Sequence, residues 1–272
     1  MNKLKIGIVG CGAIGSSLAK VIVKDFGREA RLCALFDLDK DKTRKLVKLL
    51  KGRILAADDF KSLLKKSDLV IEAASAKVSW DIAKATLSSG KDVMIMSVGG
   101  VSGRLKQLTD LAKRNNSKVY IPSGALSGID AVKASAVGKI NKVILTTTKS
   151  PLSFKGVKYV EDKGIDLSKI KKETVLFSGK AAEAVKYFPQ NINVAAVLSL
   201  AGIGENQTQV KIIASPGVIR NTHEVRVESP AASISTRTEN VLHPDNPKTS
   251  YLAVLSAIAM LKHILEPVVI GT

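Results

Sequence analysis

Apolar runs alternate with amphipathic segments throughout residues 1–122 of the chain. The apolar runs are rich in β-branched residues and predict buried strands, which lie at 6–9, 32–37, 67–74, 92–98 and 118–122. The segments between them predict helices, which lie at 13–23, 40–50, 77–88 and 105–115. Strands separated by helices of this length predict a parallel sheet with right-handed crossovers.

Beyond Pro122 the pattern changes to strand-like runs in which apolar and polar residues alternate, at 142–149, 174–179, 208–214 and 222–228. This alternation predicts an open sheet with one face packed on helices and the other facing a partner or solvent. Residues 149–172 are rich in lysine and interrupted by Pro and Gly, which predicts a loop. The run 248–265 predicts a last helix that returns to pack on the first part of the chain.

Three glycines, Gly10, Gly12 and Gly15, form a Gly-x-Gly-x-x-Gly pattern between the first predicted strand and the first predicted helix. Gly10 allows a tight turn, Gly12 lets the backbone approach a pyrophosphate, and Gly15 lets helix and strand pack closely. The N-terminus of the helix offers unpaired N–H groups to the anion. This order of strand, glycine turn and helix predicts a dinucleotide-binding site.

Asp37 ends the second predicted strand, where a carboxylate can accept hydrogen bonds from both ribose hydroxyls of an adenosine. Because it would repel a 2′-phosphate, we expect NAD as the cofactor, with NADP as a second one that the site could accept. Small residues after later strands are also expected in the cleft, although they are equally typical of ordinary strand-to-helix turns. The cofactor residues predicted in this way are Gly10, Gly12, Ala13, Ile14, Gly15, Asp37, Ala74, Ser75 and Ser97.

The predicted fold class is therefore α/β, with an N-terminal Rossmann dinucleotide-binding domain and a smaller α+β domain that contains a mixed sheet. We expect residues 1–122 and 246–272 to form the first domain, because the last predicted helix returns to it. Residues 123–245 are expected to form the second domain.

The composition is that of a globular protein, since 45% of the 272 residues are hydrophobic. Cys11 and Cys33 are too few for a disulfide framework, and free cysteines fit a reducing compartment. Lys3 and Lys5 precede a weakly apolar stretch that could be read as a signal peptide, but the glycines interrupt that stretch. No run reaches the ~18 uninterrupted apolar residues of a spanning helix. We therefore expect a soluble, cytoplasmic protein with no membrane partner.

The formal net charge is +18, from 42 Lys and Arg against 24 Asp and Glu, and such a charge is typical of nucleic-acid-binding proteins. The lysines are scattered over predicted helix surfaces and loops, however, aromatic residues make up only 4%, and zinc or helix-turn-helix signatures are missing from the sequence. A solvated basic surface is therefore favoured, without a nucleic-acid partner or a metal. Dianionic substrates and phosphate-bearing cofactors would still be attracted to it.

Four distinctive motifs follow the glycine turn, between residues 122 and 250. They are Pro-Ser-Gly-Ala-Leu-Ser-Gly at 122–128, Phe-Pro-Gln-Asn-Ile-Asn at 188–193, Asn-Thr-His-Glu at 221–224 and Asn-Pro-Lys-Thr-Ser at 246–250. Together they make nearly the whole chain similar to the L-aspartate dehydrogenase family. The resemblance implies NAD(P)-dependent oxidation of L-aspartate to iminosuccinate, which hydrolyses to oxaloacetate and ammonia or feeds quinolinate and NAD biosynthesis. It also implies a homodimer built through the second domain, which would be the catalytic and dimerisation domain.

The resemblance further implies roles for single residues. His223, in the Asn-x-His-Glu element, would be the active-site residue. Ala125 and Asn193 would contact the cofactor, with Asn191 close by.

The contacts to the substrate carboxylates are predicted separately, because the chain departs from the family in two places. Thr148-Lys149-Ser150 stands where an Arg-Lys-Pro run is usual, and the run 228–232, Glu-Ser-Pro-Ala-Ala, replaces a turn that contains glycine. A helix that starts near Lys248 would offer N–H donors as well as side chains to a carboxylate. The candidate anchors are Lys248, Thr249, Ser250 and Arg220.

Oxidation of an amine at Cα needs an acid or base within reach, and histidine titrates near neutral pH. The chain has three histidines. We expect His263 on the surface or in packing, while His243 precedes a proline in a loop and could approach the cleft. His223 shares an alternation face with Val225 and Val227, so the residues alone equally allow a buried core histidine. The resemblance favours the catalytic role.

The sequence also argues against several related enzyme classes. A phosphorylating aldehyde dehydrogenase needs a nucleophilic thiol in the second domain, but no cysteine follows Cys33. The paired histidines of dihydrodipicolinate reductases and the Glu-Lys-Pro element of related sugar dehydrogenases do not occur in the expected places. Two alternatives stay open: a dehydrogenase of another small amino acid, and a non-catalytic regulator that senses NAD or associates with nucleic acid through its basic surface.

Overall fold

The computed structural model describes residues 2–51, 54–188, 192–244 and 246–271. The chain forms two compact units. The first contains the residues up to Pro122 together with Val254–Ile270, and the second contains Ser123–Ala253. Each unit has its own sheet and its own apolar core.

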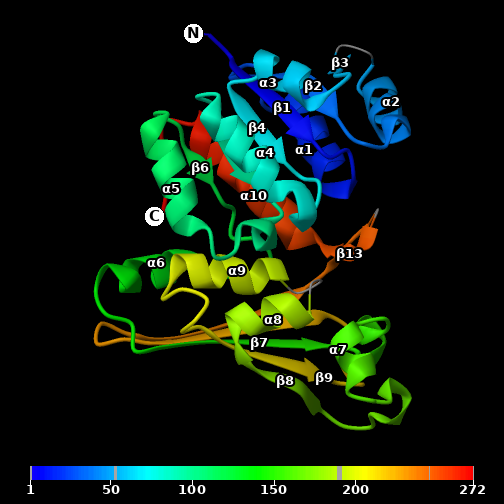
Figure 1. The fold of residues 1–272 in the computed structure, drawn as a ribbon, viewed down its shortest axis with the longest axis vertical. Helices are drawn as coiled ribbons and strands as arrows, with labels where there is room; N and C mark the ends of the chain where they lie inside the picture. The colour runs from blue at the N-terminus through cyan, green and yellow to red at the C-terminus, as the bar shows by residue number, and fades with distance from the viewer. Residues whose placement is uncertain (1, 52–53, 189–191, 245, 272) are drawn as a thin grey trace. The chain divides into compact units, whose positions relative to one another are not determined.

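The first unit is built on a six-stranded parallel sheet with helices between most of its consecutive strands (Figure 1). The strand order is β3-β2-β1-β4-β5-β6, so the order reverses at β1, which is where open parallel sheets bind dinucleotides. Its elements are β1 (Leu4–Val9), α1 (Ala13–Lys24), β2 (Ala30–Phe36), α2 (Lys40–Leu49), β3 (Leu55–Ala56), α3 (Phe60–Lys66), β4 (Leu69–Glu72), α4 (Ala76–Ser88), β5 (Asp92–Ile95), the 3₁₀ helix η1 (Val98–Val101), α5 (Leu105–Arg114), β6 (Val119–Tyr120) and most of α10 (Tyr251–Leu265).

The central strands of this sheet are apolar on both faces because helices cover both. All four residues of β4 are buried, as are the last four of β1. Helix α10 contributes to the same core although it lies at the far end of the sequence. The core of the unit includes Ile6, Ile8, Leu18, Ile22, Ile71, Ala257 and Leu261.

The second unit is built on a five-stranded mixed sheet of order β11-β10-β7-β9-β8, in which β7 and β9 are parallel and the other pairs antiparallel. Helices α6, α8 and α9 cover one face (Figure 1). Its elements are α6 (Ile129–Val137), β7 (Lys142–Lys149), η2 (Pro151–Phe154), α7 (Lys158–Asp162), η3 (Leu167–Lys169), β8 (Thr174–Lys180), α8 (Ala181–Tyr187), α9 (Ile192–Ala201), β9 (Gln209–Ala214), β10 (Asn221–Glu228), β11 (Ser233–Asn240), β12 (Leu242–His243) and β13 (Asn246–Ser250).

The two faces of this sheet differ as the alternating sequence predicts. Leu145 of β7 and Val225 and Val227 of β10 are buried on the face toward the helices, while Arg226 and Glu228 are exposed on the other. The predicted fold class, a Rossmann domain with a mixed α+β sheet domain, is confirmed.

Residues 150–170 differ from the loop that the sequence predicts. They form the short helices η2, α7 and η3, and the side chains of Phe154, Val157 and Val160 are buried in the core of the second unit. These three apolar residues recur every third position, so one side of the segment packs while its many lysines remain in water.

The run 248–265 also differs from its prediction. The expectation of a helix that starts near Lys248 is wrong, because residues Asn246–Ser250 form β13, which pairs with β12. Helix α10 begins only at Tyr251, whose N–H donates to the carbonyl of Val241 at 2.9 Å. The boundary between the compact units accordingly lies after Ala253 rather than at residue 246.

Candidate active site

The turn between β1 and α1 is shaped by its glycines. Gly10 has a φ of 99°, and a Cβ there would lie 2.4 Å from the carbonyl oxygen of Ala73. A Cβ on Gly15 would lie 1.9 Å from the carbonyl oxygen of Gly10, whereas a Cβ on Gly12 would meet no atom within 4 Å. Gly10 and Gly15 are therefore needed for packing, and Gly12 leaves open space over the turn.

The N-terminus of α1 lies directly behind this open space. Gly12 is the N-cap residue and has no side chain to cap the helix, and no acidic residue is found in the first turn. The N–H groups of Ala13 and Ile14 are thus available to an anion in the way that a pyrophosphate site requires.

Asp37 is held in a fixed orientation beside the turn. Its Oδ2 accepts a hydrogen bond from the N–H of Cys11 at 2.7 Å, and its Oδ1 accepts one from the N–H of Asp39 at 2.9 Å. Each oxygen keeps a lone pair for a further donor, which is what two ribose hydroxyls need. Cys11 takes part only through its backbone, since burial raises the pKa of its thiol to about 11.

A cavity of about 550 Å³ lies at this end of the sheet. Apolar residues form most of its wall, together with Lys42 and Asp81. Of the cofactor residues predicted from the glycine pattern and strand ends, it is lined by Gly10, Gly12, Asp37, Ala74 and Ser75. The glycine turn, the helix N-terminus and the oriented carboxylate meet at one cavity, so the residues present fit an adenine dinucleotide.

Glu72 is a positioning residue that the sequence reasoning missed. It is fully buried at the end of β4, where Oε1 accepts from the N–H of Ala74 at 2.9 Å. Its Oε2 accepts from the N–H of Ser97 at 3.0 Å and from the hydroxyl of Ser79 at 3.1 Å. Burial raises the pKa of this carboxyl group, and these hydrogen bonds oppose the rise. Glu72 thereby joins the loops after β4 and β5. In the sequence it could have been noticed as a single acidic residue near the end of an apolar run.

In the second unit, His223 lies on the inner face of the sheet and is 5% exposed. It pairs with Thr147 of β7 on one side and with Thr238 of β11 on the other. The Thr147 hydroxyl lies 3.0 Å from Nδ1 of His223. No described residue hydrogen-bonds Nε2, so this is the ring nitrogen left for a reacting group.

The charge state of His223 follows from its surroundings. Burial, and secondly the positive charge of Lys149, lower the pKa of His223 to about 3. Burial also lowers the pKa of Lys149 to about 8. At neutral pH the imidazole is therefore neutral and carries a lone pair, while Lys149 remains largely protonated. Thr147 and Lys149 are two further residues that the sequence reasoning did not place in the site.

The Ser-Gly-Ala turn that contains Ala125 is attached to β11. Asn240 donates from Nδ2 to the carbonyl of Ala125 at 3.2 Å, and the hydroxyls of Ser127 and Thr238 lie 2.8 Å apart. The hydroxyl of Thr236 donates to the carbonyl of Ser127 at 3.3 Å. Strand β11 therefore fixes this turn next to the row of residues that contains His223.

Some predicted cofactor residues, Ala13, Ile14, Gly15 and Ser97, are not among the residues that line the cavity. Ala13, Ile14 and Gly15 lie on α1 behind the cavity, and Ser97 follows β5. Asn191 lies outside the described residues, and Asn193 is an exposed residue in the first turn of α9.

The predicted carboxylate anchors lie on or near β13. The side chain of Lys248 lies outside the described part of the chain. The hydroxyl of Thr249 accepts from Nδ2 of Asn246 at 3.1 Å, and the hydroxyl of Ser250 donates to Oδ1 of Asn240 at 2.6 Å. Arg220 is exposed. As for the two other histidines, His243 is buried against the ring of Tyr251 and His263 is exposed.

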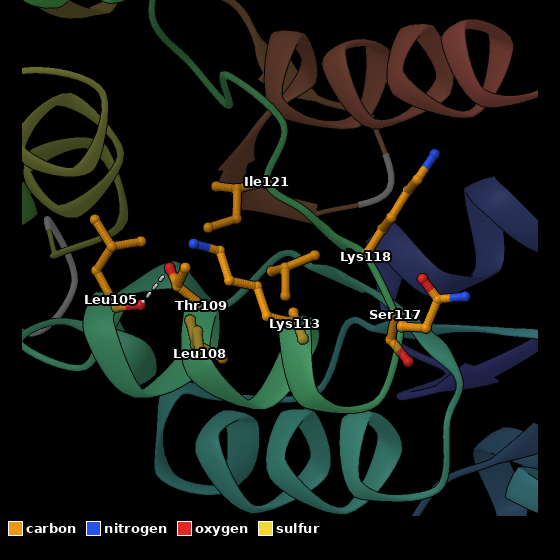
Figure 2. A pocket seen from close by; sticks show the side chains of 10 residues that line it. Leu105, Leu108, Thr109, Lys113, Ser117, Lys118 and Ile121 are labelled. Carbon is orange, nitrogen blue, oxygen red and sulfur yellow. Dashed lines mark hydrogen bonds between the residues drawn. The ribbon is translucent and has the colours of Figure 1, made fainter.

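A second cavity, of about 580 Å³, lies between α5 and the edge strand β6 (Figure 2). Its walls contain Leu105, Leu108 and Ile121 together with Lys113 and Lys118. None of the predicted site residues lines it, and its walls contain no acid, histidine or cysteine. It therefore lacks the carboxylates and imidazoles that most often act as general acids and bases.

The described residues contain no group of three or more His, Cys, Asp and Glu side chains placed to hold a metal ion. They also contain no helix that is both long and apolar enough to span a bilayer.

Two family models match successive segments of the chain, and the C-terminal segment includes most of α10, which the fold assigns to the first unit. The family model "Aspartate dehydrogenase, C-terminal" matches residues 130–264. The family model "Homoserine dehydrogenase, NAD binding domain" matches residues 10–122. The second match confirms the NAD cofactor predicted from the glycine turn.

Whole-chain comparisons agree. The chain is 48% identical over 271 residues to the L-aspartate dehydrogenase of Methanosarcina barkeri, covering 99% of this chain and 100% of the relative. It is 47% identical over 272 residues to that of Methanococcoides burtonii, with the same coverage. The crystal structure of aspartate dehydrogenase from Thermotoga maritima shares the fold, with a TM-score of 0.75 at 23% identity over 99% of this chain and 100% of that one. The resemblance seen in the motifs is thus confirmed, and the chain belongs to the L-aspartate dehydrogenase family.

Proposed function

We propose that this protein is an oxidoreductase that uses NAD to oxidise L-aspartate to iminosuccinate, with His223 as its catalytic residue. The observation that carries the proposal is the neutral imidazole of His223, held through Nδ1 by Thr147 at 3.0 Å with Nε2 left for a reacting group. The identity to L-aspartate dehydrogenases over the whole chain supports the choice of substrate.

The reaction sets clear demands on the protein. The Cα–H bond of aspartate breaks and its electron pair leaves as hydride, while the amine loses a proton and a C=N bond forms. Bound NAD supplies the hydride acceptor. The protein must supply a proton acceptor near neutral pH, and it must bind two carboxylates.

For the first demand, His223 supplies an unprotonated ring nitrogen, which in the free protein is a weak base. Because its pKa is lowered to about 3, the ring is unprotonated before substrate binds and can accept a proton at Nε2. Thr147 acts as a positioning residue, since its hydroxyl fixes the ring through Nδ1.

For the cofactor, we propose that the turn Gly10–Gly15 with Ala13 and Ile14 holds the pyrophosphate and that Asp37 holds the adenosine ribose. Ala74, Ser75 and Ser97 would line the cleft, and Ala125, Asn191 and Asn193 would follow the family pattern. Lys42 also lines the cavity, 3.6 Å from Asp39. Its ammonium offers a cation for a 2′-phosphate, which supports NADP as a second cofactor.

Four further expectations are part of the same proposal. Family membership supports a homodimer formed through the second unit's sheet, which sedimentation analysis would test. The free cysteines Cys11 and Cys33 fit a cytoplasmic location. Iminosuccinate as the product supports a role in quinolinate and NAD biosynthesis, and scattered lysines support the expectation that nucleic acid is not a partner.

The decisive experiment measures NADH formation with L-aspartate, beside L-glutamate, L-alanine and L-homoserine. We expect turnover specific for aspartate, and a loss of about 10²- to 10⁴-fold in kcat for His223→Ala with NAD binding retained. His263→Ala is the matched control, because this histidine is exposed at the end of α10.

The result that would overturn the proposal is tight NAD binding without turnover of any of the four amino acids. Retention of nucleic acid that weakens with salt would then favour the regulator. Turnover of alanine or homoserine in preference to aspartate would indicate a dehydrogenase of another small amino acid.

A further inference from the structure

Lys149, the last residue of β7, lies on the inner face of the second unit's sheet. It follows Thr147 by two positions, and strand residues two apart share a face. The half-buried Lys149 acts on the charge state of His223, so the ammonium and the imidazole lie in one region of low polarity.

The Lys149 ammonium has no anion within the described part of the chain. No described carboxylate lies within ion-pair distance of it, and no described residue accepts a hydrogen bond from it. The carboxylates of β10 and β11 pair with other cations on the opposite face, Glu224 and Glu239 with Arg237, and Glu228 with Lys142. A cation that is partly shielded from water and has no counter-ion costs free energy, and such residues are concentrated at binding and catalytic sites.

A second polar group without a hydrogen-bond partner lies across the sheet from Lys149. Thr222 of β10 is opposite Thr148 of β7, and extending this register by one residue places Asn221 opposite Lys149. Residues directly opposite in an antiparallel pair share a face and lie within side-chain reach. No described residue hydrogen-bonds the carboxamide of Asn221. The ammonium of Lys149 and the amide of Asn221 are therefore two neighbouring donors, one step along the sheet from His223.

We propose that Lys149 and Asn221 bind one carboxylate of the L-aspartate substrate and so place its Cα and amine beside His223. An ammonium with three N–H donors and a carboxamide with two match the two oxygens of a carboxylate. The assignment rests on the proposed function for the identity of the substrate, but the carboxylate site itself follows from the second unit alone.

Binding at this position has a consequence for His223. The positive charge of Lys149 opposes protonation of the imidazole. A bound carboxylate compensates that charge, so the pKa of His223 rises when substrate is present. The imidazole is therefore a better proton acceptor in the substrate complex than in the free protein, and turnover is coupled to carboxylate binding.

The first test measures binding of succinate, a dicarboxylate without an amine, by calorimetry in the presence of NAD. We expect Lys149→Met to weaken succinate binding by about 10- to 100-fold, because a charge-assisted hydrogen bond is lost. Asn221→Ala should weaken it by about 5-fold. Lys149→Arg should recover part of the affinity. Lys142→Met is the matched control on the same strand, since Lys142 is exposed and pairs with Glu228.

The second test separates this role from a structural one. We expect the KM for aspartate of Lys149→Met to rise by the same factor as the Kd for succinate, with a smaller change in kcat and unchanged NAD affinity and Tm. Lys149→Gln serves in its place if the Met variant folds poorly. A loss of kcat at unchanged KM would overturn the proposal in favour of proton transfer by Lys149.

The outcomes also distinguish this proposal from the proposed function. If the wild type oxidises aspartate and Lys149→Met binds succinate as well as the wild type does, the carboxylate site is wrong and the function stands. If the wild type oxidises no amino acid but loses succinate binding on Lys149→Met, the carboxylate site stands and the function is wrong.

Discussion

The glycine turn of the first unit and the inner sheet face of the second unit each carry candidate functional groups, but they are built in different ways. In the turn, the groups are backbone N–H donors and the space left by missing side chains, and most belong to residues 10–15. On the sheet face, the groups are side chains from distant parts of the chain. Thr147 and His223 are 76 positions apart, and Ser127 and Thr238 are 111 apart.

The two sites are therefore abolished by opposite kinds of substitution. A site made by backbone is lost when atoms are added, because the space over the turn is filled. A site made by side chains is lost when atoms are removed or when the register of the strands changes.

Glu72 is the clearest exception to this difference, because in the first unit a side chain, and not the backbone, positions two loops. We expect Glu72→Ala to lower the free energy of unfolding by about 3–5 kcal/mol, since the N–H groups of Ala74 and Ser97 and the Ser79 hydroxyl lose their acceptor. Urea denaturation measures the change, with Glu29→Ala as the control at an exposed acid. A loss below about 1 kcal/mol would show that these donors find other partners.

Gly10 and Gly12 form a matched pair within the turn. Gly10→Ala should destabilise the protein by about 3 kcal/mol, because of its positive φ and the contact with Ala73. Gly12→Ala should leave the unfolding free energy unchanged within about 0.5 kcal/mol, since its Cβ meets nothing within 4 Å. It should nevertheless weaken NAD binding by about 10-fold or more, which corresponds to about 1.4 kcal/mol. Equal NAD affinity in Gly12→Ala would contradict the assignment of this space to the cofactor.

For the sheet face, the buried histidine predicts how stability depends on pH. The pKa of His223 is about 3 in the folded protein against a usual 6.5, so between these values the unfolded chain binds a proton that the folded chain does not. Stability from this group is complete above pH 6.5 and is lost as the pH falls toward 3. Between pH 7 and 5 the wild type should lose about 2 kcal/mol relative to His223→Asn in urea denaturation. Parallel curves for the two proteins would show that the ring is not buried in its neutral form.

The smallest effect is expected where β11 holds the turn that contains Ala125. Thr238→Val removes the hydroxyl that lies 2.8 Å from Ser127 and should lower the free energy of unfolding by about 1 kcal/mol. Ser235→Ala, on the exposed side of the same strand, is the control and should change nothing measurable. If both variants behave alike, the contact with Ser127 does not stabilise the turn.

Local sequence was informative wherever the determining contacts are local. The strand, glycine turn and helix at Leu4–Lys24 follow from apolar period and glycine spacing: the predicted strand at 6–9 lies within β1, and the predicted helix at 13–23 lies within α1. The segment 150–170 was not predicted correctly, because its Pro, Gly and lysine residues obscure the apolar residues, Phe154, Val157 and Val160 among them, that pack it on the core. Likewise, β13 was missed because its pairing with β12 replaces the helical turn that the sequence favours there.

The amino-acid sequence was enough to predict the fold class and the glycine turn with Asp37. The catalytic role of His223, which the resemblance to a family implies, stays a prediction. The role of Glu72 in joining two loops became visible only in the folded structure. The same holds for the hydrogen bond of Thr147 to His223 and for the effect of the Lys149 charge on that ring. The physical reason is the range of the contacts. Glycine conformation and helix periodicity act over a few residues and are visible in the chain, whereas burial, charge and cross-strand neighbours depend on which strands pair and in which register.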